Sequence, residues 1–477
     1  MDPSGAKVAA GAVIDVTADD ALGRDDACGL AKRLASGEVS AAELREAALV
    51  RARAADAALN AVTVWVDPAA PPPPAPDGSP FAGVPSVVKD TDDLAGYPTT
   101  QGSWAVPDRP ARTSSRWVEQ FLRLGFVPVA KTTLPEFGLT ASTESSRFGA
   151  TRNPWHPGRS AGGSSGGSAA LVAAGVVALA HANDGGGSIR IPAACCGLVG
   201  LKPSRGRLVD SLDTRLLPVR LTTQGVLTRT VRDTARYYAA AERLHRDPRL
   251  PAIGLVEGPG AARLRVAVVL GGTRGLPVSA ETTAAVRDVA ELLSDLGHHV
   301  EEVPTPVDDR FGPDFLRYWG LLAFALKNAG ARVFGPGFDG SRTETLTTGL
   351  SRLVAQQAAG LPASLRRLRR LARAHEDVYE RWDVVLSPVT GHPPPPVGYL
   401  GPDVDFRTHL VRLLRFTSFT PLQNVSGSPA ISLPLGWSPA GLPIGVQAAA
   451  PFGHERRLLE LAFELEAAAP WPMTPSS

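Results

Sequence analysis

Residues 162–190 read GGSSGGSAALVAAGVVALAHANDGGGSIR, with a glycine-rich cluster at each end of an apolar segment. Residues 168–174 predict a helix, and the apolar residues 176–180 predict a buried strand. The clusters cover residues 162–168 and 185–188. Consecutive glycines allow the backbone to come close to another group, and their successive N–H groups can converge on one point. A developing oxyanion needs such donors, so the two clusters indicate a candidate active site.

The chain on either side of this stretch alternates segments typical of strands and helices. Ser40 and Glu43 match the S-x-x-E capping box that starts a helix. Strands are expected at 83–90, 127–130, 264–270, 300–303, 384–386, 430–435 and 444–448. Helices are expected twice within 25–59, at 114–124, after a lead-in at 131–136, at 280–296, over most of 311–382 and at 455–468. This alternation predicts a layered α/β fold.

The composition limits the class of protein. The 477 residues include 48 glycines and 43 prolines, more than average, while 44% of the chain is hydrophobic. A disordered chain cannot bury that much apolar surface, and no Gly-X-Y period is present, so disorder and collagen are excluded. Prolines at 71–80 and 393–396 predict surface connections. The net charge of +2 creates no overall field for nucleic acid or an anionic membrane, so neither is an expected partner.

Cysteine use and the apolar segments predict a soluble, cytoplasmic protein. Cys28, Cys195 and Cys196 are too few for a disulfide framework and suit a reducing compartment. Residues 1–23 lack a basic segment followed by a clean apolar core, so no signal peptide is expected. The longest apolar stretch, residues 169–180, is too short to span a bilayer.

A basic run near residue 370 has two interpretations. Leucines recur within it at helical spacing, which predicts the solvated face of an amphipathic helix. The alternative is a patch for an anionic substrate. The run contains Arg366, Arg367, Arg369, Arg370 and Arg373.

Three short motifs between residues 86 and 167 suggest different chemistries. Residues 162–166 match the G-x-S-x-G nucleophile elbow, which needs an acid and a histidine further along the chain. Residues 86–89 match S-x-x-K, but that motif needs a helix, and Pro85 with two valines favours extended chain. Residues 162–167 have P-loop spacing without the lysine that would reach a phosphate. A fourth interpretation is that the glycines only form tight turns.

Taken together, several motifs in order resemble the amidase signature family. The resemblance covers most of the chain and is strongest from Gly83 to Asp233. It implies an α/β fold in which helices cover both faces of a mixed, twisted central sheet. It also implies one domain over 1–477, with an N-terminal helical region (1–70), a signature core (83–233) and a variable, mostly helical pocket region (300–382). The matching segments are 83–85 with Lys89 and Asp90, 162–168, 184–193, 200–203, 227–233, Asn424 with 427–430, and 441–447.

The resemblance also implies which residues act. Carried over by motif position, Ser188 is the nucleophile, Ser164 is a bridging serine that follows a cis peptide bond, and Lys89 is the base. The backbone N–H groups of Gly185, Gly186, Gly187 and Ser188 would form the oxyanion hole. Substrate contacts are expected from Gly138, Leu139, Thr140 and Gly163. No cofactor or metal is expected.

Other polar residues near the motifs are expected to support the structure. Asn183 and Gly185 depart from the usual family pattern, in which threonine is common at the first position and a larger residue at the second. Asp184 and Arg190 are expected to brace the glycine loop. The residues expected to serve structure rather than catalysis are His156, His181, His454, Asn424 and Gln447.

The resulting hypothesis is a serine amidohydrolase. It would cleave the C–N bonds of small apolar or aryl amides through an acyl-enzyme, with carbamate and ester hydrolysis as further activities. The pocket would draw on aromatic residues between 311 and 350: Phe315, Tyr318, Trp319, Phe324, Phe334 and Phe338. The run 182–188 with Cys195 and Cys196 also resembles the branch of nylon-oligomer cyclic-dimer hydrolases. A glutaminase subunit of a tRNA amidotransferase is the other alternative. A monomer or homodimer is expected.

Overall fold

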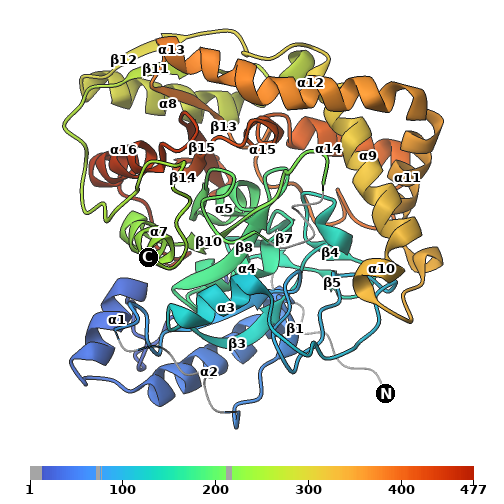
Figure 1. Ribbon diagram of the computed structural model, residues 1–477. Coiled ribbons are helices and arrows are strands. Elements are labelled where there is room, and N and C mark those ends of the chain that lie inside the picture. Colours follow the sequence, from blue (N-terminus) through green and yellow to red (C-terminus); the bar gives the residue numbers. More distant parts are fainter. Residues whose placement is uncertain (1–12, 71–75, 77, 211–216, 477) are drawn as a thin grey trace.

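An eight-stranded mixed sheet forms the centre of the molecule, in the strand order β12-β11-β13-β15-β14-β9-β10-β8 (Figure 1). The structure is a computed structural model and describes residues 13–70, 76, 78–210 and 217–476. Strand β11 pairs in parallel with β12 and β13, whereas the remaining neighbours are antiparallel. The strands are β8 (Leu179–Asp184), β9 (Val199–Lys202), β10 (Thr223–Thr228), β11 (Arg265–Val268), β12 (His299–Glu302), β13 (Val384–Pro388), β14 (Ala430–Trp437) and β15 (Pro443–Ala449).

Three smaller sheets complete the strand content of the described residues. The first has the order β1-β3-β2, and its edge strand β2 lies alongside β8, where the Ser86 hydroxyl donates to the Leu179 carbonyl. The other two are hairpins. The strands are β1 (Val62–Trp65), β2 (Pro85–Lys89), β3 (Val127–Thr132), β4 (Glu144–Ser145), β5 (Gly149–Ala150), β6 (Arg152–Asn153) and β7 (His156–Ser160).

Helices cover both faces of the large sheet. Gly436 of β14 pairs with Ile444 of β15, so these two residues face the same side of the sheet. Gly445 follows Ile444 in β15 and therefore faces the opposite side. A Cβ on Gly436 would meet Ala285 of α8, and one on Gly445 would meet Ala194 of α5. The helices are α1 (Ala27–Ala35), α2 (Ala41–Leu59), α3 (Arg116–Arg123), α4 (Gly166–Ala173), α5 (Arg190–Cys196), α7 (Val231–Leu244), α8 (Ala280–Asp295), α9 (Phe311–Ala329), α10 (Ala331–Phe334), α11 (Thr345–Gln356), α12 (Leu361–Ala374), α13 (Val378–Arg381), α14 (Phe406–Phe416), α15 (Pro421–Ser426) and α16 (Glu455–Ala468).

The α/β prediction is confirmed, with two local corrections. The strand expected at 176–180 runs from Leu179 to Asp184 and therefore leads directly into the second glycine cluster. The segment 131–136 does not lead into an α-helix, because β3 continues to Thr132 and only a 3₁₀ turn follows. Phe137 in that turn has φ 51°, a left-handed conformation that no α-helix continues. The capping box at Ser40 is present.

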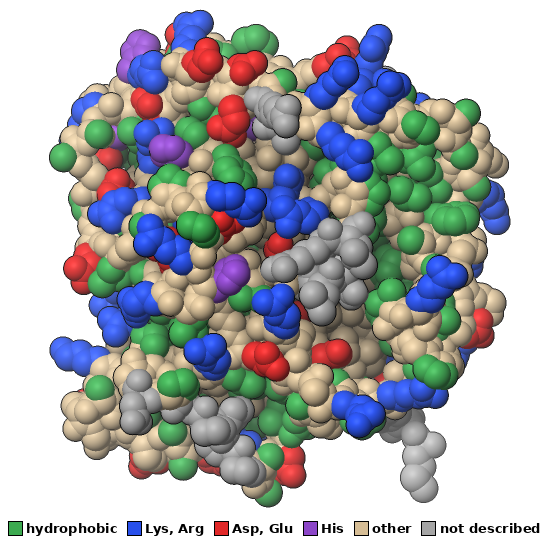
Figure 2. All heavy atoms as spheres, viewed as in Figure 1, with side chains coloured by type: hydrophobic (Ala, Val, Ile, Leu, Met, Phe, Trp, Pro, Cys, Tyr) green, Lys and Arg blue, Asp and Glu red, His purple; other side chains and the backbone are tan. Residues whose placement is uncertain are grey.

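The basic run forms the outer face of α12. Figure 2 shows Lys and Arg side chains gathered over this helix at the upper right. Arg366, Arg369 and Arg370 are exposed and Leu368 is buried, as expected for an amphipathic helix. Arg367 pairs with Asp314 of α9. The side chain of Arg373 and the stretch 71–75 lie outside the described residues.

Candidate active site

Lys89 ends strand β2 and is completely buried. Pro85 and the valines that follow it favour extended chain, and all five residues of the strand are buried. This geometry rules out the helical S-x-x-K arrangement. The Lys89 side chain points toward the first glycine cluster, where its Nζ lies 2.8 Å from Ser164 Oγ and 2.9 Å from Ser165 Oγ. A third contact joins Nζ to Asn183 Oδ1 at 2.7 Å.

Burial brings the pKa of Lys89 close to neutral pH. Removal from water disfavours the charged ammonium and lowers the pKa of Lys89 to about 7, although the carboxylates of Asp92 and Asp184 oppose this shift. A substantial share of the side chain is therefore neutral at pH 7, and a neutral amine can accept a proton.

Ser164 follows a cis peptide bond from Gly163, as predicted. It is 2% exposed and lies two residues before the helix α4, whose N-cap is Ser165. Gly138 approaches it from another part of the chain, since a Cβ on Gly138 would lie 3.0 Å from Ser164 Oγ. Gly138 also has φ +66°, so glycine is required there for both space and conformation.

Ser188 occupies the turn between β8 and α5, and an ion pair holds that turn. Arg190 Nε donates to Asp184 Oδ2 at 2.9 Å, and both side chains are fully buried. Burial alone would raise the pKa of the Asp184 carboxyl, but the Arg190 guanidinium lowers it to about 2. Arg190 also donates to Asn424 Oδ1 and Gln447 Oε1. The bracing expected of these residues is therefore present.

The expected oxyanion donors are not equivalent. The Gly187 N–H donates to Asp184 Oδ1 at 2.7 Å and so is already engaged. Within the described residues, no acceptor takes the N–H groups of Gly185, Gly186 or Ser188. The structure thus corrects the prediction for Gly187 and leaves three candidate donors.

A cavity of about 500 Å³ opens beside these groups. Ser188 and Gly186 lie in its wall, and the Ser188 side chain makes no hydrogen bond to the described residues. All four predicted substrate contacts line the same cavity: Gly138, Leu139, Thr140 and Gly163. The structure therefore brings the two glycine clusters and the 138–140 loop to one site.

The predicted aromatic residues separate into wall and scaffold. Phe315 and Trp319 of α9 line the cavity, and Trp319 Nε1 donates to the Leu139 carbonyl at 3.2 Å. Tyr318 faces the other way and donates to the Val219 carbonyl. Phe334 and Phe338 stack on each other instead.

Sequence reasoning missed the wall that α14 contributes. Leu410, Leu413 and Leu414 of α14 line the cavity together with the α9 residues. Their i, i+3, i+4 spacing is the signal of an amphipathic helix and could have identified it. Phe311 and Ser418 also line the cavity and were not predicted.

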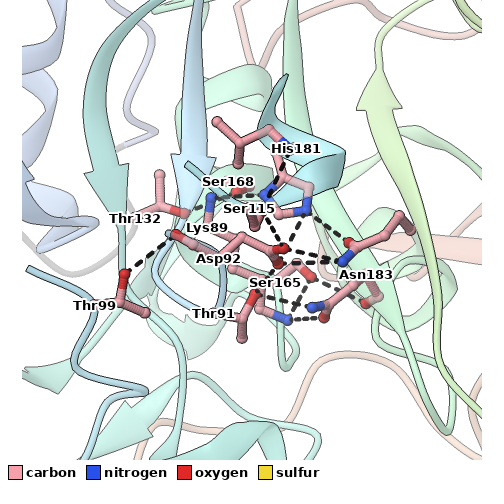
Figure 3. A network of polar contacts seen from close by, with 12 residues as sticks. Lys89, Thr91, Asp92, Thr99, Ser115, Thr132, Ser165, Ser168, His181 and Asn183 are labelled. Carbon is pink, nitrogen blue, oxygen red and sulfur yellow. Dashed lines mark hydrogen bonds and ion pairs between the residues drawn. The ribbon is translucent and has the colours of Figure 1, made fainter. Parts of the chain in front are cut away.

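His181 is a structural residue that contacts Lys89 directly. Its Nδ1 accepts the backbone N–H of Lys89 at 3.1 Å, and both residues are labelled in Figure 3. Trp117 stacks on the imidazole ring. Burial lowers the pKa of His181 to about 4, so it is neutral at pH 7. No histidine of the described chain hydrogen-bonds to Ser164 or Ser188, which argues against the Ser-His-Asp interpretation of the elbow motif.

Two other classes of site find no support in the described ranges. No group of three or more His, Cys, Asp or Glu side chains there could hold a metal ion. None of the described helices combines the length and apolar character needed to cross a membrane.

Comparisons with known sequences point to one family. The Amidase family model matches residues 43–459. "Putative amidase AmiC" of Mycobacterium leprae is 48% identical over 463 residues, covering 95% of this chain and 97% of that protein. The 6-aminohexanoate-cyclic-dimer hydrolase of a Pseudomonas species is 36% identical and covers 94% of this chain and 95% of its own.

Solved structures give the same result. A 6-aminohexanoate cyclic dimer hydrolase superposes with a TM-score of 0.82 at 32% identity, covering 95% of this chain and 98% of its own. A bacterial aryl acylamidase of the amidase signature family has a TM-score of 0.80 at 26% identity, with 94% and 97% covered. The chain belongs to the amidase family, and it is a hydrolase acting on the C–N bonds of amides.

Proposed function

We propose that this hydrolase uses Ser188 as nucleophile, Ser164 as proton relay and Lys89 as base. The observation that carries the proposal is the 2.8 Å contact between the buried Lys89 amine and Ser164 Oγ, because Gly163, the residue before Ser164, lines the same cavity as Ser188. A serine hydroxyl attacks a carbonyl effectively only when a base takes its proton. Lys89 supplies a base with a pKa of about 7.

The reaction would proceed in two halves. Ser188 Oγ attacks the amide carbonyl while its proton passes to Ser164 and the Ser164 proton passes to Lys89 Nζ. The free N–H groups of Gly185, Gly186 and Ser188 stabilise the oxyanion. The C–N bond breaks as the proton returns through Ser164 to the leaving amine. Water then attacks the Ser188 ester, and the acid is released.

The cavity favours small apolar or aryl substrates. Phe311, Phe315 and Trp319 form one wall and the α14 leucines another. The side chains of Phe315 and Trp319 approach Gly186 within 4 Å of the position a Cβ would take, so an apolar group bound there lies next to the proposed oxyanion donors. Carbamates and esters use the same acyl transfer, and we include both as further substrates.

The proposal predicts a substrate order. Butyryl-4-nitroanilide, whose acyl chain is apolar, is expected to give a kcat/KM at least about tenfold above that of the charged succinyl-4-nitroanilide. The cavity wall is mostly apolar, and the guanidinium of Arg317, which also lines it, is already engaged by Asp314, Gln357 and Ser364. A release assay with these anilides, an aryl carbamate, an aryl ester and glutamine measures the order. Hydrolysis of glutamine alone would contradict the apolar-pocket proposal.

A cyclic amide dimer belongs in the same panel. Two relatives named as 6-aminohexanoate cyclic dimer hydrolases match nearly the whole chain, at 36% identity in one sequence and at a TM-score of 0.82 in one structure. If the cyclic dimer exceeds the anilides in kcat/KM, the cyclic-amide alternative replaces the aryl amide.

The pH dependence tests the base. Lys89 accepts a proton only when neutral, so kcat/KM is expected to rise with pH and level off above its pKa of about 7. At pH 5 it is expected to be about 100-fold below the plateau, since one proton must be lost. His181, with a pKa of about 4, stays neutral over most of this range. The measurement is kcat/KM for an anilide from pH 4.5 to 9, and a profile flat from pH 5 to 9 would exclude Lys89 as the base.

A further inference from the structure

The three partners of Lys89 Nζ match the bonding capacity of a neutral amine. Such an amine has two N–H donors and one lone pair. Asn183 Oδ1 lies at 2.7 Å, Ser165 Oγ at 2.9 Å and Ser164 Oγ at 2.8 Å. If Asn183 and Ser165 accept the two N–H groups, the lone pair is left for the Ser164 hydroxyl. That distribution depends on which end of the Asn183 amide faces Lys89.

Asp92 determines the orientation of the Asn183 amide through two successive hydrogen bonds, with the Thr91 hydroxyl between them (Figure 3). Its carboxylate accepts from the hydroxyls of Thr91 and Ser115, each at 3.0 Å, and from Gln224 Nε2 at 3.2 Å. The Thr91 hydroxyl has one hydrogen, which it gives to Asp92, so it can only accept from its other neighbour. That neighbour is Asn183 Nδ2 at 2.9 Å. The amide nitrogen therefore faces Thr91, and the amide oxygen faces Lys89.

A second arm from the same carboxylate holds the Lys89 backbone. Gln224 donates to Asp92, so its Oε1 faces His181 Nε2 at 2.9 Å. Nε2 must then carry the ring proton, and the unprotonated Nδ1 accepts the backbone N–H of Lys89 at 3.1 Å. A carboxylate only accepts hydrogen bonds, so Asp92 fixes which atom donates and which accepts along both hydrogen-bond chains.

We propose that Asn183, oriented by Asp92 through Thr91, is a positioning residue for Lys89, whose amide oxygen takes one N–H of the amine and leaves the lone pair for Ser164. The inference rests on the proposed function. It assigns a role to a residue that departs from the usual family pattern, where threonine is common. A neutral acceptor suits the site, since it binds an N–H without stabilising the ammonium as a carboxylate would.

The other groups around Lys89 leave Asn183 as the sensitive position. From β8, the Asp184 carboxylate is bound by Arg190, and His181 is neutral. From β3, Lys131 is paired with Asp90 at 2.8 Å. Asp92, the remaining charged group, acts on the amine through its field but makes no direct hydrogen bond to it; the hydrogen-bond link runs through Thr91 and Asn183. Asn183→Asp would therefore add a carboxylate in direct contact with the Lys89 amine.

The test is the pH dependence of Asn183→Asp. A carboxylate in contact with an amine favours the ammonium and raises its pKa by about 1–3 units. The acidic limb of kcat/KM is expected to move up by that amount, with activity recovering at higher pH. A role confined to folding would lower activity without moving the limb. Asn328→Asp, on the exposed side of α9, adds the same charge away from Lys89 and is expected to leave the limb in place.

Two further variants cover the case in which Asn183→Asp does not fold. Asn183→Leu keeps the branching at Cγ but accepts no hydrogen bond, and it is expected to lower kcat by about 10–100-fold at every pH. Asn183→Thr restores an acceptor and is expected to recover most of that loss without moving the limb. A leucine variant as active as the wild type would overturn the inference.

A substrate-independent probe separates this inference from the proposed function. Phenylmethanesulfonyl fluoride reacts with an activated serine hydroxyl, losing fluoride as the oxygen–sulfur bond forms and the base takes the proton. If Ser188 is labelled and the acidic limb of kcat/KM lies at the same pH in the wild type and in Asn183→Asp, only the role of Asn183 is overturned. Failure to label Ser188, together with an active Ser188→Ala variant, would overturn the proposed function itself.

Discussion

Ser188→Ala is expected to lower kcat/KM for amide hydrolysis by about 10⁴-fold or more, because the variant has no group to form the acyl-enzyme. The measurement is release of 4-nitroaniline from an apolar anilide at pH 8, with burst kinetics on the wild type to detect the acyl-enzyme. The fold should tolerate the change, since the Ser188 hydroxyl has no partner among the described side chains and backbone groups. The melting temperature is therefore expected to remain near that of the wild type.

Ser418→Ala is the matched control for this prediction. Ser418 also lines the cavity, but its hydroxyl only reaches the Arg415 carbonyl at 3.4 Å. The same chemical change there is expected to alter kcat/KM by less than about threefold, in line with a marginal hydrogen bond. If Ser188→Ala kept more than a tenth of wild-type activity, Ser188 would not be the nucleophile.

The parts of the fold that follow from local patterns could be predicted from the sequence. Helix α16 occupies Glu455–Ala468, the range its periodicity indicates. The valines before Lys89 favour the strand that is present, and the glycine clusters lie beside one cavity. The helix and the strand depend on side chains a few residues apart, whereas the meeting of the two glycine clusters at one cavity depends on tertiary packing.

The features that the sequence did not predict depend on distant partners. The Gly187 N–H is engaged because Asp184 turns back onto it, and that turn is held by Asn424 and Gln447 from the other end of the chain. His181 looks like one polar residue in a buried strand until Gln224 and Asp92 are placed beside it. The direction of a hydrogen-bond chain cannot be read from spacing when its members lie on separate elements.

Lys89→Met is expected to lower kcat/KM by about 10²–10⁴-fold, the usual contribution of a general base. Methionine fills similar space in the buried site but cannot take the Ser164 proton. The rise of kcat/KM between pH 5 and 7 is also expected to disappear, because the group with a pKa of about 7 is gone. The measurement is kcat/KM for the anilide over the same pH series, with the folding of Lys89→Met checked by thermal melting.

Lys202→Met provides a matched control that separates burial from position. Lys202 is as fully buried as Lys89, and burial likewise lowers its pKa to about 7. Its Nζ, however, donates to the Pro203 carbonyl at 2.8 Å and contacts no serine. Lys202→Met is therefore expected to keep the acidic limb and a kcat/KM within about threefold of wild type, as expected when no transition-state contact is removed. If Lys202→Met lost the limb and Lys89→Met kept it, the base would be Lys202, because a lowered pKa alone cannot identify the group that receives the proton.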